Sequence, residues 1–399
     1  MAGPVIQHTL FQILIRFRSY PVAITGDICK MYRCVKDKLQ VFKLGTGTYG
    51  TKPASFLAVQ AMHQLSRDEH SSFPLGAEVI QRDFYVDDLI SGAQTVDEAI
   101  IIVDQTSKIL SRGGFKLRKW CSNVPAALGG VSDEDKESYL KFDDGTDFIK
   151  TLGLAWDPAS DQLLFSLSVL QLTSSPCRRS VLSAIARFYD PLGLVGPVIA
   201  KAKIFLQQLC KKRLFWDESL PEAQNTEWSS ICRSSVQIKR LCFPRLVLSP
   251  NSEIQVHGFC DASMEAYGAC VYIVCSGQSQ LLCSKSRVAP LKTLTVPKLE
   301  LCGADLLSKL IEGQYYCWSD SAVALSWIRD EPFRFNMFVA NRVAAIQERT
   351  DSMERYVPTS LNPADILSRG VLPTELSESP IWFNGPTFLC GPKCRIGIG

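Results

Sequence analysis

The sequence has few histidines, and its cysteines lack the spacing of a zinc module. Its 399 residues include 4 histidines, and its 15 cysteines are scattered from Cys29 to Cys394 without a Cys-x-x-Cys motif. A zinc module requires such clusters, and a disulfide-stapled scaffold is normally much shorter, so both classes are excluded. We expect reduced thiols in an intracellular protein of the cytoplasm or nucleus.

Long apolar runs and an excess of charge of one sign are also missing. The longest apolar stretch, Pro191 to Ala200, contains two prolines and two glycines, which excludes a membrane span there. Lys+Arg 43 against Asp+Glu 40 gives a net charge of +3, so overall charge does not indicate a nucleic-acid binder. A hydrophobic content of 46% is globular, and this length predicts two or three domains.

Basic residues are nevertheless concentrated in one segment. Between Arg178 and Arg213 there are eight basic residues and a single acid, Asp190. Such clustering suits contact with a phosphate backbone, although a solvated helix face is the alternative. The candidate nucleic-acid contacts are Arg178, Arg179, Lys211, Lys212 and Arg213.

The strongest local signal is an acidic pair between apolar residues, in the segment from Arg82 to Ile90. The pattern predicts a β-hairpin with Asp87 and Asp88 at its turn. Burying two adjacent carboxylates is costly without a cation, and Mg²⁺ prefers carboxylates together with substrate phosphates. A third carboxylate, Asp27, ends a short apolar strand upstream. The alternative is an ordinary hairpin with a surface acid pair.

A second set of acids lies in the part of the chain that alternates strands and helices, residues 251–370. Each of the four acids ends an apolar element or begins a helix: Asp261, Glu300, Asp320 and Asp365. A single acid at a strand end is usually structural, but four in register with these elements predict one metal site.

The first acidic set resembles the palm of a reverse transcriptase. Tyr85-Val86-Asp87-Asp88 is similar to its Y-x-D-D box, Asp27 to its first catalytic aspartate, and the run from Gly50 to Phe56 to the motif beside template and incoming nucleotide. The resemblance implies an antiparallel sheet with helices, and two Mg²⁺ ions held by Asp27 and Asp87 with support from Asp88. Its partners would be an RNA template, a DNA primer and deoxynucleoside triphosphates.

Two further roles are implied by the same resemblance. Tyr32 would exclude the ribose 2′-hydroxyl of a wrong nucleotide. Lys119 would lie near the departing pyrophosphate, with a surface lysine as the alternative.

The second acidic set resembles the D-E-D-D set of ribonuclease H. The resemblance implies that Asp261, Glu300, Asp320 and Asp365 hold two Mg²⁺ ions, with Mn²⁺ as a possible substitute, at the scissile phosphate of an RNA–DNA hybrid. A histidine assists near the last acid in some relatives, and none of the four histidines is near Asp365.

Three segments narrow the family. Arg82 to Asp88, Phe115 to Asn123, and Ala186 to Leu194 followed by Trp216-Asp217-Glu218 resemble the Pol polyprotein of BEL/Pao long-terminal-repeat retrotransposons. Part of this region is often labelled a Pao retrotransposon peptidase. An aspartic peptidase requires Asp-Thr-Gly or Asp-Ser-Gly, and the sequence contains neither, so we expect no peptidase activity.

Together these signals predict a multidomain protein of the α/β and α+β classes. We expect a truncated reverse transcriptase fingers and palm (1–160), a basic helical thumb or connection (161–250), a ribonuclease H-like mixed sheet with helices (251–370) and a poorly ordered tail (371–399). The predicted function is an RNA-directed DNA polymerase and ribonuclease H fragment. We expect the polymerase to be impaired, because only 26 residues precede Asp27. The alternatives are a non-catalytic nucleic-acid-binding remnant and an unrelated α/β protein.

Overall fold

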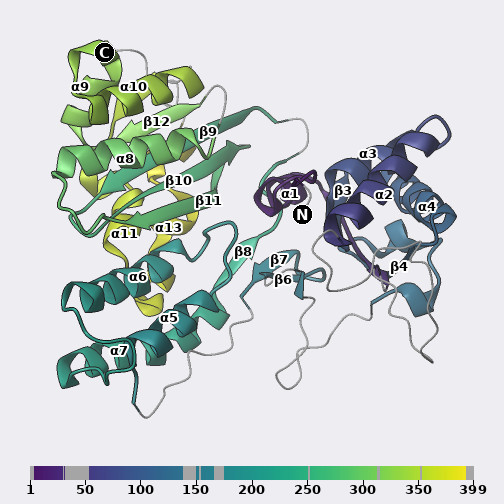
Figure 1. Ribbon diagram of the computed structural model, residues 1–399. Helices are drawn as coiled ribbons and strands as arrows, with labels where there is room; N and C mark the ends of the chain where they lie inside the picture. The colour runs from purple at the N-terminus through teal and green to yellow at the C-terminus, as the bar shows by residue number, and fades with distance from the viewer. Residues whose placement is uncertain are drawn as a thin grey trace. The chain divides into compact units, whose positions relative to one another are not determined.

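The computed structural model describes residues 4–29, 31, 54–137, 150–151, 154–165, 175–249, 252–311, 315–350 and 353–391. The chain divides into two compact units (Figure 1). The N-terminal unit combines Met1–Thr151, Trp156–Gln162 and Pro244–Pro250. The C-terminal unit combines Leu152–Ala155, Leu163–Phe243 and Asn251–Gly399. The helical segment predicted as a separate thumb or connection therefore shares a unit with the ribonuclease H-like segment.

The N-terminal unit is built on an antiparallel sheet with the strand order β2-β3-β1-β4. Its strands are β1 (Val22–Cys29), β2 (Phe84–Tyr85), β3 (Asp88–Ala93) and β4 (Lys116–Ser122). Its helices are α1 (Leu10–Phe17), α2 (Ala54–Glu69), α3 (Pro74–Arg82) and α4 (Val96–Arg112). The predicted hairpin is present, and its turn lies between β2 and β3.

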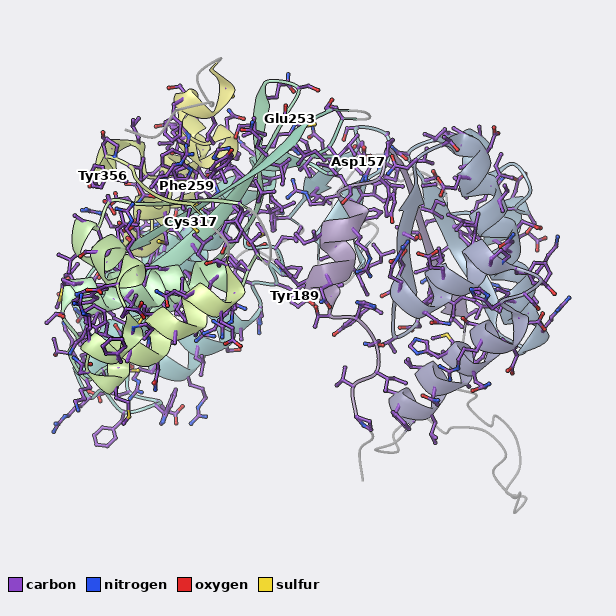
Figure 2. All side chains as sticks on the ribbon, turned by 90° about the horizontal axis from the view of Figure 1, so that it is seen from above. Asp157, Tyr189, Glu253, Phe259, Cys317 and Tyr356 are labelled. Atoms are coloured by element: carbon purple, nitrogen blue, oxygen red, sulfur yellow. The ribbon has the colours of Figure 1, made fainter. Side chains whose placement is uncertain are left out.

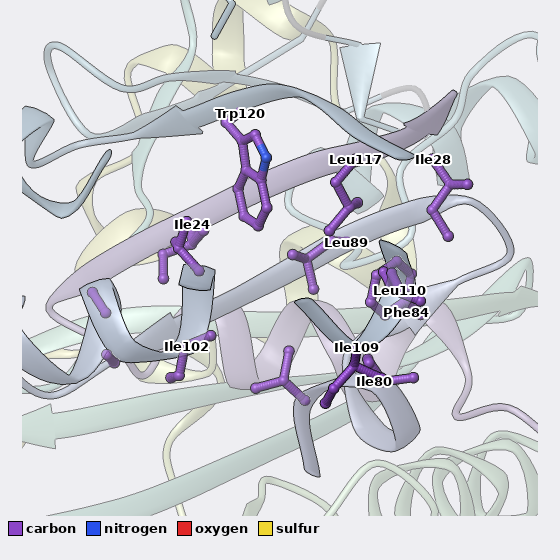
Figure 3. Close-up of a cluster of buried hydrophobic side chains, with 14 of the residues drawn as sticks. Ile24, Ile28, Ile80, Phe84, Leu89, Ile102, Ile109, Leu110, Leu117 and Trp120 are labelled. Carbon is purple, nitrogen blue, oxygen red and sulfur yellow. The ribbon is translucent and has the colours of Figure 1, made fainter. Parts of the chain in front are cut away.

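Helix α4 illustrates how local sequence sets the elements that cover this sheet. The side chain of Thr95 accepts a hydrogen bond from the backbone N–H of Glu98 at the start of the helix. The helix stops at Gly113, and Gly114 then adopts a left-handed conformation with φ of +75°. Between these ends the helix buries its apolar side against the sheet. Figure 3 shows this core, in which Trp120 of β4 and Leu89 of β3 face the helical residues Ile102 and Ile109.

A buried arginine joins the separate segments of the N-terminal unit. The Arg245 side chain is fully buried, and its Nε and Nη2 donate to the two carboxylate oxygens of Asp161 at 2.6 and 2.7 Å. Its Nη1 donates to the backbone carbonyls of Phe17 and Tyr20 at 2.5 and 2.7 Å. The backbone carbonyl of Arg245 in turn accepts from Arg18 Nε at 3.1 Å. Residues from three distant parts of the sequence are thus held by one guanidinium.

The C-terminal unit is built on a mixed sheet with the order β11-β10-β9-β12-β13. Its strands are β9 (Ile254–Ala262), β10 (Ala266–Cys275), β11 (Gln278–Val288), β12 (Tyr316–Ser319) and β13 (Met353–Tyr356). The first three pair in antiparallel fashion, and β12 runs parallel to both β9 and β13. Figure 2 labels Phe259 and Cys317, which lie on the neighbouring strands β9 and β12.

Helices cover both faces of this sheet. The helices are α5 (Arg178–Ala186), α6 (Gly196–Lys211), α7 (Glu222–Ser234), α8 (Val296–Ser308), α9 (Ala322–Arg329), α10 (Met337–Arg349), α11 (Ala364–Arg369), α12 (Pro373–Ser377) and α13 (Pro380–Asn384). A Cβ at Gly258 of β9 would meet Leu307 of α8, whereas one at Gly268 of β10 would meet Leu367 of α11. Gly268 pairs with Asp261, three residues from Gly258, so α8 and α11 lie on opposite faces.

The prediction of a poorly ordered tail is wrong for residues 373–391. The Trp382 side chain is fully buried, and its indole N–H donates to the carbonyl of Leu194 at 2.8 Å. The Tyr272 hydroxyl of β10 donates to the carbonyl of Trp382 at 2.8 Å. The tail is ordered because it covers the sheet with a large apolar side chain whose polar atoms are satisfied.

Four short strands occupy the stretches in which the chain passes from one unit to the other. They are β5 (Lys150–Thr151), β6 (Leu154–Asp157), β7 (Gln162–Leu164) and β8 (Cys242–Pro244). The described cysteines are free thiols. None of the described helices has the length and apolar content to cross a membrane.

The ion pair between the buried Arg245 and the partly buried Asp161 should contribute strongly to the stability of the N-terminal unit. Asp161→Ala leaves the guanidinium buried without its carboxylate, and we expect a loss of about 3–5 kcal/mol in the free energy of unfolding. The matched control is Asp104→Ala, which breaks an ion pair to Lys108 whose side chains are both more than half exposed, and this change should cost less than about 1 kcal/mol. Urea unfolding of the full chain measures both, and equal losses would contradict the structural role.

Candidate metal centre and palm acids

Asp261 lies at the carboxyl end of the central strand β9 and is buried. Its carboxylate accepts a hydrogen bond through Oδ2 from the hydroxyl of Ser368, a fully buried residue of α11. Ser263 Oγ donates to the backbone carbonyl of Ser368 at 2.9 Å, which fixes the distance between α11 and the end of β9. The carboxylate therefore has a defined orientation set by a helix from the far end of the sequence.

Glu300 comes from the first turns of α8 on the other face of the sheet. A Cβ at Gly303, one turn later, would lie 3.2 Å from the backbone carbonyl oxygen of Asp261. The absence of a side chain at Gly303 therefore lets α8 approach β9 closely enough to bring Glu300 beside Asp261. The Glu300 side chain is buried, and its Oε2 has no hydrogen-bond partner among the described residues.

Asp320 follows the last residue of β12, the strand next to β9. Thr359 Oγ1 donates to Asp320 Oδ2 at 2.6 Å, and Asn362 Nδ2 lies 3.3 Å from Oδ1. The same Asn362 amide donates to the backbone carbonyl of Cys260 at 3.0 Å. Because adjacent parallel strands end at the same edge, Asp320 and Asp261 meet there, and Asn362 bridges their strands.

These three acids form a compact set of ligands. Within the described ranges, Asp261, Glu300 and Asp320 are the only group of three or more His, Cys, Asp or Glu residues whose ligand atoms all lie within 4.8 Å of one another. Burial, followed by repulsion from Asp261 and Asp320, raises the pKa of Glu300 to about 9. Burial likewise raises the pKa of Asp261 to about 7, with Asp320 and Asp365 contributing. The site concentrates negative charge that a cation would neutralise.

Asp365, the fourth predicted acid, is on α11 and is paired with Arg369, whose Nε lies 2.6 Å from Oδ1. It lies outside the compact group of ligand atoms, although its charge contributes to the raised pKa of both Asp261 and Glu300. It therefore adjoins the site, and its role as a ligand stays a prediction.

The palm acids of the N-terminal unit are brought together by strand pairing. Asp27 of β1 is directly opposite Asp88 of β3 in the antiparallel register. Asp87 occupies the hairpin turn, and its backbone carbonyl accepts from the N–H of Ile28 at 2.9 Å. Val86 before it has a φ of 60°, an unusual conformation for a β-branched residue that shapes this turn.

A lysine accompanies these acids. Lys119 Nζ lies 2.7 Å from Asp27 Oδ2, and this hydrogen bond raises the lysine pKa. Burial raises the pKa of Asp88 to about 7, with smaller contributions from Asp87 and Asp27. Lys119 was predicted to lie beside a phosphate product, and the structure pairs its ammonium with Asp27 while most of its side chain stays exposed.

The other predicted site residues have varied surroundings. Tyr85 lies on β2, whereas Tyr32 and Gly50 fall outside the described residues. Arg179 pairs with Asp217 through Nε at 2.7 Å, and Arg178 donates to the carbonyl of Leu214 and lies over the ring of Trp216. These two arginines are already engaged within the fold. Lys211, Lys212 and Arg213 are exposed.

Sequence reasoning missed the residues that orient the acids. Ser368, Thr359 and Asn362 supply hydroxyl and amide donors to Asp261 and Asp320. One signal was available for Ser368, because it follows Asp365 by three residues on a short helix and therefore lies on the same side of it. For Thr359 no local signal exists, since its partner is 39 residues away.

Repulsion among the three clustered acids predicts an unusual pH dependence in the presence of a chelator. The folded-state pKa values of Asp261 and Glu300, about 7 and about 9, lie above their ordinary values, so their contribution to stability is present at acidic pH and is lost as pH rises through 7 to 9. We expect Asp261→Asn to raise the melting temperature at pH 8, by about 2–4 °C for each kcal/mol of repulsion relieved.

The measurement is thermal unfolding of the full chain in chelator between pH 5 and pH 9. Mg²⁺ should raise the melting temperature of the original protein at pH 8 and have a much smaller effect on the variant. A variant that is less stable than the original protein at every pH would contradict the repulsion.

Comparisons with known proteins agree with this architecture. Residues 177–321 match the family model of the Pao retrotransposon-like RNaseH-like domain. Among solved structures, a foamy viral protease-reverse transcriptase bound to double-stranded DNA has a TM-score of 0.55 at 14% identity, covering 90% of this chain and 60% of that one. The same foamy viral protein bound to an RNA/DNA hybrid gives a TM-score of 0.53 at 14% identity, over 90% of this chain and 46% of that one. No curated protein matches the chain.

The chain thus spans about half of the length of these viral proteins, and at this identity the likeness concerns the fold. The predicted fold class is confirmed, since the unit with the antiparallel sheet and the unit with the mixed sheet are both present. The predicted resemblance to BEL/Pao retrotransposons is confirmed as well. Residues 177–321 are similar to the Pao retrotransposon-like RNaseH-like domain, and the fold of the chain is similar to that of the foamy viral protease-reverse transcriptase.

Proposed function

We propose that this protein is a ribonuclease H that hydrolyses the RNA strand of an RNA–DNA hybrid with divalent cations. The observation that carries the proposal is the convergence of Asp261, Glu300 and Asp320 within 4.8 Å in the RNaseH-like domain. A buried cluster of like charges has no structural value in itself, because each carboxylate destabilises the others. The cluster is therefore best explained as a ligand set.

The donors fit Mg²⁺, with Mn²⁺ as a substitute. All are carboxylate oxygens, which hard cations prefer, and Glu300 Oε2 is buried without a partner among the described residues. Asp261, Glu300 and Asp320 would hold the cations, and we include Asp365 as a fourth ligand because it adjoins them. When bound, the ions would activate a water molecule and stabilise the leaving 3′-oxygen of the cleaved strand.

The surrounding residues would hold the carboxylates in the orientation needed to bind the cations. Ser368 restricts rotation of the Asp261 carboxylate, and Thr359 with Asn362 does the same for Asp320. The hydrogen bond donated by Ser368 favours the ionised form of Asp261, so it opposes the protonation that burial promotes. Preorganised ligands lower the cost of assembling the site when substrate arrives.

Cleavage of a labelled RNA–DNA hybrid in Mg²⁺ tests the proposal. We expect Asp261→Asn and Glu300→Gln to lower the rate by at least about 100-fold, since each loses several kcal/mol of charge stabilisation. The control is Glu348→Gln, the same substitution at an exposed residue of α10, which should leave the rate unchanged. Absence of cleavage together with intact hybrid binding would support the non-catalytic alternative.

A second candidate function is a weakened RNA-directed DNA polymerase. The alignment of Asp27 with Asp88 across β1 and β3, next to Asp87, favours it. Binding of two cations there would require Lys119 to release Asp27, with which it forms an ion pair at 2.7 Å.

Primer extension on an RNA template measures this second activity. We expect extension well below that of a processive polymerase, and we expect Asp87→Asn to abolish what remains, because Asp87 is the hairpin carboxylate proposed to hold the metal. Processive extension by the original protein would refute the impairment. Weak extension that survives Asp87→Asn would refute the assignment of the palm acids.

A further inference from the structure

An exposed aromatic ring follows the C-terminal end of α6, in the loop that leads to α7. The loop of residues 213–218, here called the aromatic–basic loop, contains Phe215 with 80% of its surface exposed and Trp216 with 45% exposed. A phenylalanine exposed to this extent contributes nothing to the core of the unit. Phe215 and Trp216 are adjacent exposed aromatic residues next to a run of basic residues, a combination used by single-strand binding sites.

The loop is held in place against the N-terminal end of α5. The backbone N–H of Arg179 donates to the carbonyl of Trp216 at 3.0 Å, and the N–H of Leu220 donates to the carbonyl of Pro176 at 2.8 Å. The N–H of Phe215 donates to Glu218 Oε2 at 2.9 Å. Phe215 is therefore exposed on a loop whose backbone is held in place by hydrogen bonds.

Three basic residues lie just before the exposed ring in the sequence, without matching acids. The two acids of the loop are engaged, because Asp217 pairs with Arg179 and Glu218 accepts from the loop backbone. Lys211, Lys212 and Arg213 are exposed, and no ion pair is present for any of these three within the described part of the chain. The loop thus combines one free aromatic face with three uncompensated positive charges.

The backbone at Arg213 supports a functional role for its side chain. Helix α6 is capped by Lys212, and Arg213 follows with a φ of +56°, in the left-handed position that glycine normally fills at a helix end. An arginine there is strained by its Cβ. A residue with a strained backbone conformation of this kind is expected where its side chain has a function.

We propose that the aromatic–basic loop and the end of α6 bind single-stranded nucleic acid, with Phe215 stacking on an unpaired base and Lys211, Lys212 and Arg213 contacting phosphates. Stacking platforms beside positive charge are the usual means of binding single strands. This site is distinct from the metal centre, and its binding requires no cleavage. An anionic membrane surface is less suitable, because a bilayer requires a broad apolar face and Trp216 is already covered by Arg178 at 4.4 Å.

The first test is fluorescence anisotropy of labelled 12-nucleotide oligo(U) and oligo(dT) with the full chain, in chelator so that cleavage cannot contribute. Phe215→Leu should weaken binding about 10-fold, because leucine keeps the apolar surface and loses the stacking face. Phe215→Tyr, the matched aromatic control, should stay within about 2-fold of the original affinity. The RNA and DNA probes show which sugar the site prefers.

The second test concerns the charges. Replacing Lys211, Lys212 and Arg213 with Gln should lower the slope of log affinity against log salt by about 2, since each phosphate contact on a single strand contributes about 0.7. Arg213→Gly should raise the melting temperature while weakening binding, a combination that a purely structural arginine would not give.

Three outcomes would overturn the proposal. These are equal affinities for Phe215→Leu and the original protein, an unchanged salt slope in the triple variant, and binding to anionic phospholipid vesicles that exceeds binding to both oligonucleotides. Because oligonucleotide binding is measured in chelator, hybrid cleavage that survives Asp261→Asn in Mg²⁺ would refute the ribonuclease proposal without affecting this one.

Discussion

The arrangement of the C-terminal unit depends on one constraint, the repulsion between buried carboxylates at short range. Asp261, Glu300 and Asp320 come from a strand, a helix and a strand end, and no two of them are neighbours in sequence. Holding them together requires the close approach of α8 at Gly303 and the hydroxyl and amide donors of the 359–368 segment. The sheet order places β12 beside β9, and this brings Asp261 and Asp320 together at one edge of the sheet.

The N-terminal unit meets the same electrostatic problem in a different way. There the cation is part of the chain, since Lys119 neutralises Asp27 from the neighbouring strand β4. The backbone of Lys119 has a φ of 53°, and the pairing of β1 with β4 shifts register beside Asp27. The two acidic sets are therefore unequal in their demand for an external ion. Among the described residues of the mixed-sheet centre, Arg369 pairs with Asp365 and no basic side chain pairs directly with Asp261, Glu300 or Asp320, whereas Lys119 pairs directly with Asp27.

Local features were predictable because they depend on neighbouring residues. The Thr95 cap, the hairpin at Asp87, the helix beginning near Pro297 and the strand ending at Asp320 all follow from patterns within a few residues. The sequence did not predict that Trp382 would cover the sheet, that Ser368 would bind Asp261, or that Lys119 would bind Asp27. Each of these is a contact between distant segments, and it depends on how elements pack after they form.

The return of Pro244–Pro250 to the N-terminal unit affects the order in which the chain can fold during synthesis. Arg245 emerges from the ribosome 84 residues after Asp161, its partner, which at typical translation rates is a delay of about 4–17 seconds. Helices α5, α6 and α7 emerge in that interval. The first unit to be translated is therefore completed only after part of the second has appeared, so vectorial folding cannot proceed one unit at a time.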